Sequence, residues 1–478
     1  MMRALFAAAL LAPLALLAPL AQAADSSCLT CHATLDGELQ APATAFADDV
    51  HKRRGFSCAD CHGGDPASDD PETAMSKARG FRGRIARTAV PQLCARCHSD
   101  ASLIGRYKPQ QRVDQYAEYQ TSVHGKRLAA GDQAVANCAD CHGAHGIREV
   151  RDPLSPVHPL RLPETCARCH ANPAHMAKYK LPTNQFAEYR TSVHWEALSQ
   201  RGDLSAPSCA SCHGNHGATP PQVSSVAAVC GSCHSVMEDL YNKSPHQPVF
   251  SGMREGACVI CHGNHAVRRP SPAMLAGPGA VCSQCHDAES VGGKTAAQTA
   301  ALIGKLDAAV RRSDEILARA ARSGMEVSEA VLEQQEGRGD AVKARVAVHA
   351  FSLAAVQKPA EAGLAIAART YAAGQAALIK ETDFAFKQAL AYCPYSPEAV
   401  YRYVSFLVGL AQYEEMNGHL DKAGSYFDDA ILVGQTAEKF DPDNDQFSNL
   451  VNSVKSYKGK ITQHSEDFQQ AANQIRGM

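Results

Sequence analysis

Apolar positions divide the chain into three stretches with different patterns. A run of apolar residues from Ala4 to Leu20 follows Arg3, and two prolines interrupt it. From residue 24 to about 290, apolar residues are scattered among many glycines and prolines, so this stretch cannot build an ordinary hydrophobic core. From 291 to 478, apolar residues recur every three or four positions, which predicts helices.

The third stretch predicts an α-helical domain of antiparallel helices. Its first helix carries Leu302, Leu306 and Ile316 on one face and ends near Gly324, and a later one is expected to end at Pro359. The other helices are expected at about 340–357, 360–378, 384–391, 397–416 and 420–440, with a last one after residue 444. Residues 381–459 loosely resemble a tetratricopeptide-like array of helical hairpins, which implies a docking surface for a partner. Plain helical packing or self-association explains the same pattern equally well.

The first stretch has the features of a signal peptide. A positive charge precedes the apolar run, and small residues around Ala21 to Ala23 predict cleavage after Ala23. The run is short and contains prolines, which favours a cleaved signal (residues 1–23) over a membrane anchor. No later segment is apolar for long enough to span a bilayer, so we expect a periplasmic protein that meets membranes only through partners. An extracellular or outer-membrane-associated location stays open.

Charge excludes one class of partner. The formal net charge is −2, and no basic field interleaved with aromatic residues is present. The sequence therefore does not predict nucleic-acid binding.

Nine copies of the pattern Cys-x-x-Cys-His occupy the middle stretch and use eighteen of the nineteen cysteines. Two cysteines at this spacing can form thioethers to the two vinyl groups of one porphyrin, and the following histidine then lies under the iron. Redox, zinc and disulfide sites also use paired cysteines, but none requires histidine after every pair. The sequence predicts nine c-type haems in residues 24–290, stacked as the core of a mainly α region with much irregular structure.

The predicted attachment cysteines are Cys28, Cys31, Cys58, Cys61, Cys94, Cys97, Cys138, Cys141, Cys166, Cys169, Cys209, Cys212, Cys230, Cys233, Cys258, Cys261, Cys282 and Cys285. The predicted proximal iron ligands are His32, His62, His98, His142, His170, His213, His234, His262 and His286.

An internal repeat two motifs long runs through this region. The eight residues that end in His124 recur seventy positions later, ending in His194, and each copy precedes a motif extended as Cys-x-x-Cys-His-Gly-x-His. A shorter copy ends in His246. A degenerate first copy ends in His51 and carries Asp65 where the other extended motifs have their second histidine.

Nine further histidines could supply a second axial ligand to each iron. Four of them precede a motif in the repeat, three follow a proximal histidine by three residues, and two lie outside the repeat. In that order they are His51, His124, His194 and His246; His145, His216 and His265; and His158 and His175. The second group is too close to its own haem to reach the far face, so we expect it to ligate a neighbouring iron. Complete bis-histidine ligation leaves no open position for a substrate and predicts electron transfer rather than catalysis.

The repeat of Ser-x-His followed by Cys-x-x-Cys-His-Gly-x-His resembles the periplasmic multihaem cytochrome c superfamily. That superfamily includes the pentahaem donor of ammonia-forming nitrite reductase and decahaem cytochromes of outer-membrane conduits. The resemblance covers residues 28–286 and implies a bis-histidine electron relay. Its expected partners are a quinol-oxidising membrane cytochrome and either a terminal reductase or an outer-membrane acceptor.

Two other functions fit the same residues. A multihaem reductase of the nitrite, hydroxylamine or tetrathionate class requires one iron without a second ligand, and Asp65 in place of a histidine is compatible with such a vacancy. A subunit that polymerises into a continuous haem filament is the third interpretation.

Overall fold

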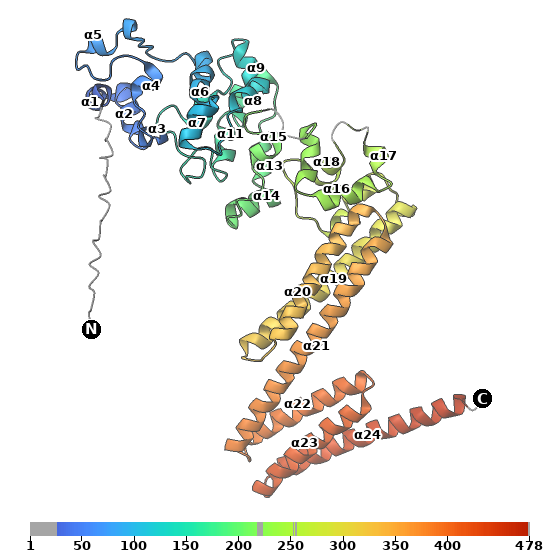
Figure 1. The fold of residues 1–478 in the computed structure, drawn as a ribbon. Coiled ribbons are helices and arrows are strands. Elements are labelled where there is room, and N and C mark those ends of the chain that lie inside the picture. The colour runs from blue at the N-terminus through green and yellow to red at the C-terminus, as the bar shows by residue number, and fades with distance from the viewer. Residues whose placement is uncertain (1–25, 218–222, 252, 254–255, 477–478) are drawn as a thin grey trace, which may run out of the picture. The chain divides into compact units, whose positions relative to one another are not determined.

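The computed structural model describes residues 26–217, 223–251, 253 and 256–476, and the predicted signal peptide (1–23) lies outside them (Figure 1). The chain divides into two compact units, one that ends at Ser271 and one that covers Pro272–Met478. All regular elements of the described residues are helices, which confirms the mainly α fold class. No helix in that part of the chain is both long and apolar enough to cross a bilayer.

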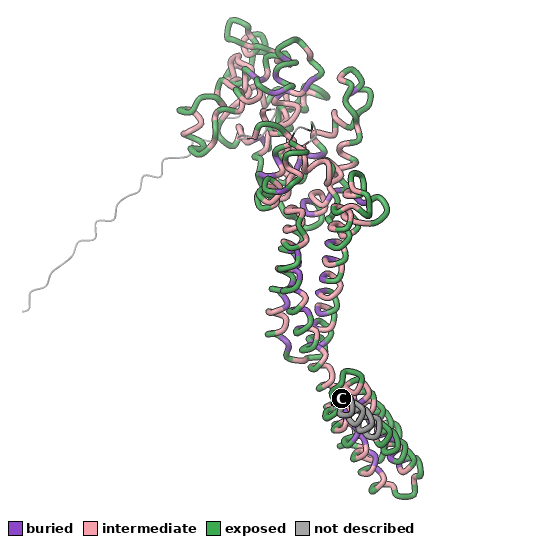
Figure 2. The backbone as a smooth tube through the Cα atoms, turned by 90° about the vertical axis from the view of Figure 1, so that its right-hand side faces the viewer, coloured by how far each residue is buried: buried purple, intermediate pink, exposed green. Residues whose placement is uncertain are grey.

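The first unit consists of short helices joined by turns and loops. Its helices are α1 (Ser27–Ala33), α2 (Ala41–Phe46), α3 (Val50–Arg53), α4 (Cys58–His62), α5 (Pro71–Ala74), α6 (Val90–His98), α7 (Ala101–Tyr107), α8 (Gln115–Thr121), α9 (Val123–Ala129), α10 (Cys138–His142), α11 (Leu162–His170), α12 (Pro173–Met176), α13 (Gln185–Tyr189), α14 (Val193–Trp195), α15 (Cys209–His213), α16 (Ser235–Asn242), α17 (Gln247–Phe250) and α18 (Ala257–His262). Figure 2 shows that most of its residues are half-buried or exposed, as expected for a region that lacks an apolar core of its own.

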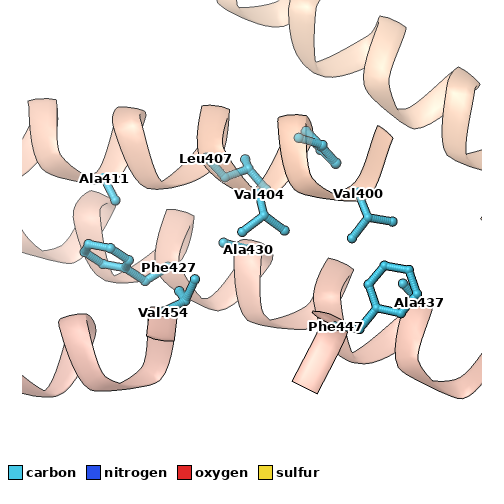
Figure 3. Close-up of a cluster of buried hydrophobic side chains, with 10 residues drawn as sticks. Val400, Val404, Leu407, Ala411, Phe427, Ala430, Ala437, Phe447 and Val454 are labelled. Carbon is cyan, nitrogen blue, oxygen red and sulfur yellow. The ribbon is translucent and has the colours of Figure 1, made fainter. Parts of the chain in front are cut away.

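The second unit contains six long helices. They are α19 (Val291–Arg322), α20 (Ser328–Ala347), α21 (Leu353–Tyr392), α22 (Pro397–Met416), α23 (Leu420–Phe440) and α24 (Asp445–Arg476). The first three pack together around a core that includes Leu306 and Val356. The last three pack around Val404, Phe427 and Phe447, all nearly or fully buried (Figure 3). The C-terminal part of α21 also contacts this second core through Phe386 and Leu390.

Two helix boundaries differ from the sequence prediction. Pro359 does not end a helix: it lies in the second turn of α21, which continues without a break to Tyr392. The chain instead breaks before α21, at Phe351, whose φ of 51° is left-handed. Pro359 is the seventh residue of α21 and removes one internal hydrogen bond, a cost that packing of α21 against α19 and α20 offsets. The predicted helices at 360–378 and 384–391 are therefore one element.

Candidate functional site

The extended Cys-x-x-Cys-His-Gly motifs share one local structure. Each of α4, α10, α15 and α18 is a short helix that ends at the histidine, and the glycine after it has a positive φ, between 71° and 86°. A helical turn places residues three apart on the same face, so both cysteines point to one side. Residues with a side chain rarely adopt this backbone conformation, which explains why the motif has glycine at this position.

Polar residues start these motif helices. Ser57, Asn137 and Ser208 are N-caps, and each forms a reciprocal capping box with the third helical residue, which is Asp60 or Asp140 in the first two cases. The variable residues of the motif thus fix its backbone. Sequence reasoning missed this role, although the capping pattern is visible in the sequence.

Three of the histidines that precede a motif face the proximal histidine of the second motif that follows them in the chain. In each case the partner belongs to a motif that lacks the glycine extension. The pairs and their ring-centroid distances are His51–His98 at 6.0 Å, His124–His170 at 6.0 Å and His194–His234 at 6.4 Å. The angles between ring planes are 89°, 59° and 33° in the same order.

The three histidines of the Gly-x-His extensions face proximal histidines as well. Each reaches back to the extended motif one repeat earlier, not to a motif adjacent in the sequence. These pairs are His62–His145 at 6.1 Å, His142–His216 at 6.2 Å and His213–His265 at 6.0 Å. Their ring planes are nearly parallel, at 10° to 18°. Asp65 takes the place of this histidine in the first extended motif, which has no extended motif before it. Its carboxylate pairs with Arg79 at 2.8 Å.

The spacing of these six pairs fits a metal ion between the rings. Two metal–nitrogen bonds of about 2 Å, together with the distance from each nitrogen to its ring centre, separate the two ring centroids by about 6 Å. The observed separations are 6.0 to 6.4 Å. The residues present therefore fit haem c: the paired imidazoles would hold the iron, and the adjacent cysteines would hold the porphyrin.

Burial favours the neutral form of nine of these imidazoles, the form that metal ligation requires. Burial and then the neighbouring His216 lower the pKa of His142 to about 4. Burial is also the main cause that lowers the pKa of His98, His124, His145, His170, His194, His213, His216 and His265.

The remaining predicted ligands have other surroundings. The Nδ1 of His32 lies 3.0 Å from the carbonyl oxygen of Leu39. His158 is buried, and its Nδ1 accepts a hydrogen bond from the amide of Leu160 at 3.3 Å, while His175 packs on the ring of Tyr179. Among the described residues, the structure does not bring these three rings to another imidazole at pair distance. His246 stacks on Phe250 at 5.6 Å. His262 is the last residue of α18, and His286 lies shortly before α19.

Consecutive motifs lie next to one another in the first unit. The leading thiols of the third and fourth, the fifth and sixth, and the seventh and eighth motifs are close enough to shift one another's pKa, and those of the first and second motifs interact electrostatically. The second thiols of the second, fourth and sixth motifs lie in range of the following motif. From the first motif to the eighth, each motif is therefore near the next one, by turns through its first cysteine and through its second.

Carbonyl and carboxylate oxygens orient several of the paired imidazoles. The Nδ1 of His62 lies 2.9 Å from the carbonyl oxygen of Gly83, and the Nδ1 of His51 lies 2.9 Å from the buried carboxylate of Asp49. A hydrogen bond at Nδ1 leaves Nε2 free to bind a metal. The repeat residues Glu118 and Glu188 approach the Nδ1 atoms of two further predicted ligands, His216 and His265, at 3.9 and 3.8 Å.

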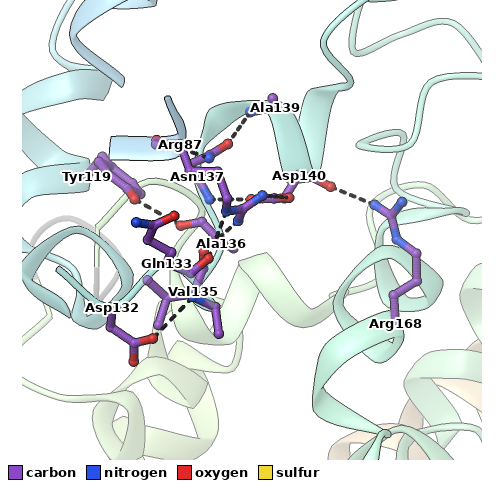
Figure 4. Close-up of polar contacts among 11 residues, drawn as sticks. Arg87, Tyr119, Asp132, Gln133, Val135, Ala136, Asn137, Ala139, Asp140 and Arg168 are labelled. Atoms are coloured by element: carbon purple, nitrogen blue, oxygen red, sulfur yellow. Dashed lines mark hydrogen bonds and ion pairs between the residues drawn. The ribbon is translucent and has the colours of Figure 1, made fainter. Parts of the chain in front are cut away.

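Arg87 ties the fourth motif to the rest of the unit (Figure 4). Its guanidinium donates to both carboxylate oxygens of Asp140, at 3.0 and 2.7 Å, and to the carbonyl oxygens of Gln133 and Val135. Arg168, from the fifth motif, donates to the backbone oxygen of Asp140 at 2.7 Å. One motif residue therefore connects two successive cofactor sites. The sequence did not reveal Arg87, because its partners lie some fifty positions away.

We expect Arg87→Lys to lower the free energy of unfolding of the first unit by about 1–3 kcal/mol, because a lysine cannot make the bidentate contact and the carbonyl contacts together. Denaturant titration followed by circular dichroism measures the change. Arg269→Lys is the control, because Arg269 pairs with Glu196 on the surface and is 64% exposed, so its loss should cost well under 1 kcal/mol. Equal destabilisation by the two variants would contradict the assignment.

Gly292 leaves room for the last predicted proximal ligand. A Cβ added to Gly292 would lie 2.3 Å from Nδ1 of His286. We expect Gly292→Ala to displace this imidazole and to reduce the yield of haem at the ninth motif, which intact-mass spectrometry measures. Gly304→Ala in the same helix is the control, because nothing lies within 4 Å of its added Cβ. A normal haem content in Gly292→Ala would refute the prediction.

Comparisons with known families match the region that contains the motifs. The model of the family described as cytochrome c3 matches residues 50–171 and 201–287, and that of cytochrome c554 and c-prime matches residues 15–63. No curated protein and no solved structure matches the chain. The two matches together span all nine motifs. Together with the motifs and the facing imidazoles, they identify the chain as a c-type haem protein of electron transfer, a member of the multihaem cytochrome c superfamily.

Proposed function

We propose that the protein is a periplasmic nonahaem cytochrome c. It relays single electrons along a row of bis-histidine haems, between a quinol-linked donor and a terminal reductase or outer-membrane acceptor. Haem c, when bound, supplies the one-electron ferric/ferrous couple. The chain attaches nine haems through the eighteen motif cysteines, and its imidazoles occupy the axial positions.

The observation that carries the proposal is the set of six facing imidazole pairs at 6.0 to 6.4 Å. An iron with a protein ligand on each face has no free position for a substrate, so its remaining activity is to gain and lose electrons. Each pair joins two segments of the repeat, so the same contacts that close the iron sites also hold the unit together.

The order of the motifs supports a relay. Successive motifs from the first to the eighth approach each other through their cysteines, so haems attached there lie in a row in sequence order. Export through the predicted signal peptide would bring the chain to the compartment in which haem c is attached. The helices of residues 291–478, proposed as a separate domain, offer a surface for partner docking or self-association.

Intact-mass spectrometry and stepwise potentiometry of the purified holoprotein test the proposal. We expect nine covalent haems per chain and reversible reduction in one-electron steps without added substrate. A chain with fewer than nine haems, or with steps that require a substrate to complete, would overturn it.

One observation favours a second candidate, a multihaem reductase of the nitrite, hydroxylamine or tetrathionate class. His32 lies outside the six pairs. In those pairs the second histidine either precedes the facing motif by one motif or belongs to the extended motif one repeat later, and neither position provides a histidine for the first motif. The haem of the first motif would then have one open axial position, where a substrate could bind the iron.

Carbon monoxide titration of the reduced protein separates the two functions. A reductase should bind one equivalent, and Cys28→Ser combined with Cys31→Ser should abolish that binding. A closed relay should bind none in either form.

A further inference from the structure

Asp49 is a buried carboxylate that contacts hydrogen-bond donors of two residues, His51 and Ile147. It is 1% exposed. One oxygen accepts from the backbone amide of His51 at 2.8 Å and also lies 2.9 Å from Nδ1 of the same residue. The other oxygen accepts from the amide of Ile147 at 2.8 Å. The carboxylate therefore fixes both the backbone and the ring of His51 and connects them to the loop that follows His145.

The same position in the repeat carries serine elsewhere. Ser122 and Ser192 precede His124 and His194 by two residues, as Asp49 precedes His51. Their hydroxyls donate to the carbonyl oxygens of Tyr119 and Tyr189, both at 2.6 Å, and accept a backbone amide of the following helix. These serines cap the helix and bond only backbone groups. Asp49 keeps the capping role and adds a contact to the imidazole.

Three contacts hold the carboxylate in its buried position: the backbone amide of His51, the ring of His51 and the backbone amide of Ile147. Its neighbour Asp48 is exposed and pairs with Arg148, at 2.8 Å. The Asp49 carboxylate thus lies 2.9 Å from Nδ1 of His51, which leaves Nε2 of that ring as the atom that can bind a metal.

We propose that Asp49 is a positioning residue that makes His51 a stronger electron donor and thereby lowers the reduction potential of the haem at Cys94 and Cys97. The inference rests on the proposed function, in which His51 and His98 are the axial ligands of that haem. An imidazole that donates its Nδ1–H to a carboxylate gains imidazolate character, and a more basic ligand stabilises the ferric state over the ferrous state. The haems at the fifth and seventh motifs, whose distal ligands follow serine, lack this contribution.

Asp49→Ser in the full-length holoprotein tests the inference, because serine is the residue that the chain itself uses at this position. We expect one reduction potential to rise by about 59 mV, a tenfold change in a one-electron equilibrium, while the other potentials and the haem content stay unchanged. Asp49→Asn should give a rise of the same sign, because the amide oxygen keeps the cap but carries no charge. It also covers the case in which Asp49→Ser folds poorly.

Asp48→Ser is the matched control. It removes the same charge one residue away but leaves the contact with His51 in place, so every potential should stay within error of the parent protein. The inference is refuted if Asp49→Asn folds and all its potentials match those of Asp48→Ser.

His51→Met separates the failure of this inference from that of the proposed function. A potential that moves in His51→Met but not in the Asp49 variants leaves the ligation intact and rejects the role of Asp49. An unchanged set of potentials in His51→Met rejects the ligation itself.

Discussion

Replacing His216 with methionine should raise one reduction potential by a large part of the ~0.8 V range that axial ligands span. His216 faces His142 at 6.2 Å with nearly parallel rings. Methionine also binds haem iron but donates less charge than imidazole, so it favours the ferrous state. Spectroelectrochemical titration of the holoprotein measures the change: the reduction potential of one haem should rise while those of the other haems stay in place. The iron should stay six-coordinate.

His419→Met is the control for this substitution. His419 is a histidine outside the haem region, and its Nδ1 contacts the carboxylate of Glu414 at 2.6 Å. We expect all potentials to stay in place. Equal shifts in the two variants, or none in His216→Met, would contradict the pairing.

Replacing Phe427 with alanine should lower the free energy of unfolding of the C-terminal helices by about 3–5 kcal/mol. The side chain is 1% exposed and packs with the residues of α22 to α24 around Val404 and Phe447. Its removal leaves a cavity that the long helices can close only in part. Thermal unfolding followed by far-ultraviolet circular dichroism measures the loss.

Phe384→Ala is the matched control, because this phenylalanine is 62% exposed in α21 and its loss should cost less than 1 kcal/mol. The absorption of the haems attached to the first eight motifs should be the same in both variants, since the residues up to Ser271 form a compact unit of their own. Loss of haem absorption at the transition of Phe427→Ala would contradict the proposed division into two domains.

The sequence predicted the elements that depend on local patterns. The helices at 397–416 and 420–440 coincide with α22 and α23, because serine, proline and glycine at their ends are strong local signals. Pro359 misled the prediction because a proline disfavours the interior of a helix. Packing of α21 against α19 and α20 outweighs that cost, and the helix begins six residues before the proline.

The candidate site shows the same division between local and distant contacts. The spacing of each motif gave the cysteines and proximal histidines, and the repeat gave the candidate distal ligands. Which imidazole faces which could not be read from spacing: His145 reaches back 83 positions to His62, past a complete intervening motif. Arg87 was missed for a similar reason, since its partners lie far along the chain. The contact of Asp49 with His51 is local, and only its contact with Ile147 is distant.

Mössbauer spectroscopy of the fully reduced, isotopically enriched holoprotein tests the central claim most directly, because low-spin ferrous haem is diamagnetic and neighbouring haems then do not disturb one another. The six imidazole pairs predict at least six low-spin ferrous irons per chain. Fewer than six would show that facing histidines do not close these irons, and would contradict the account.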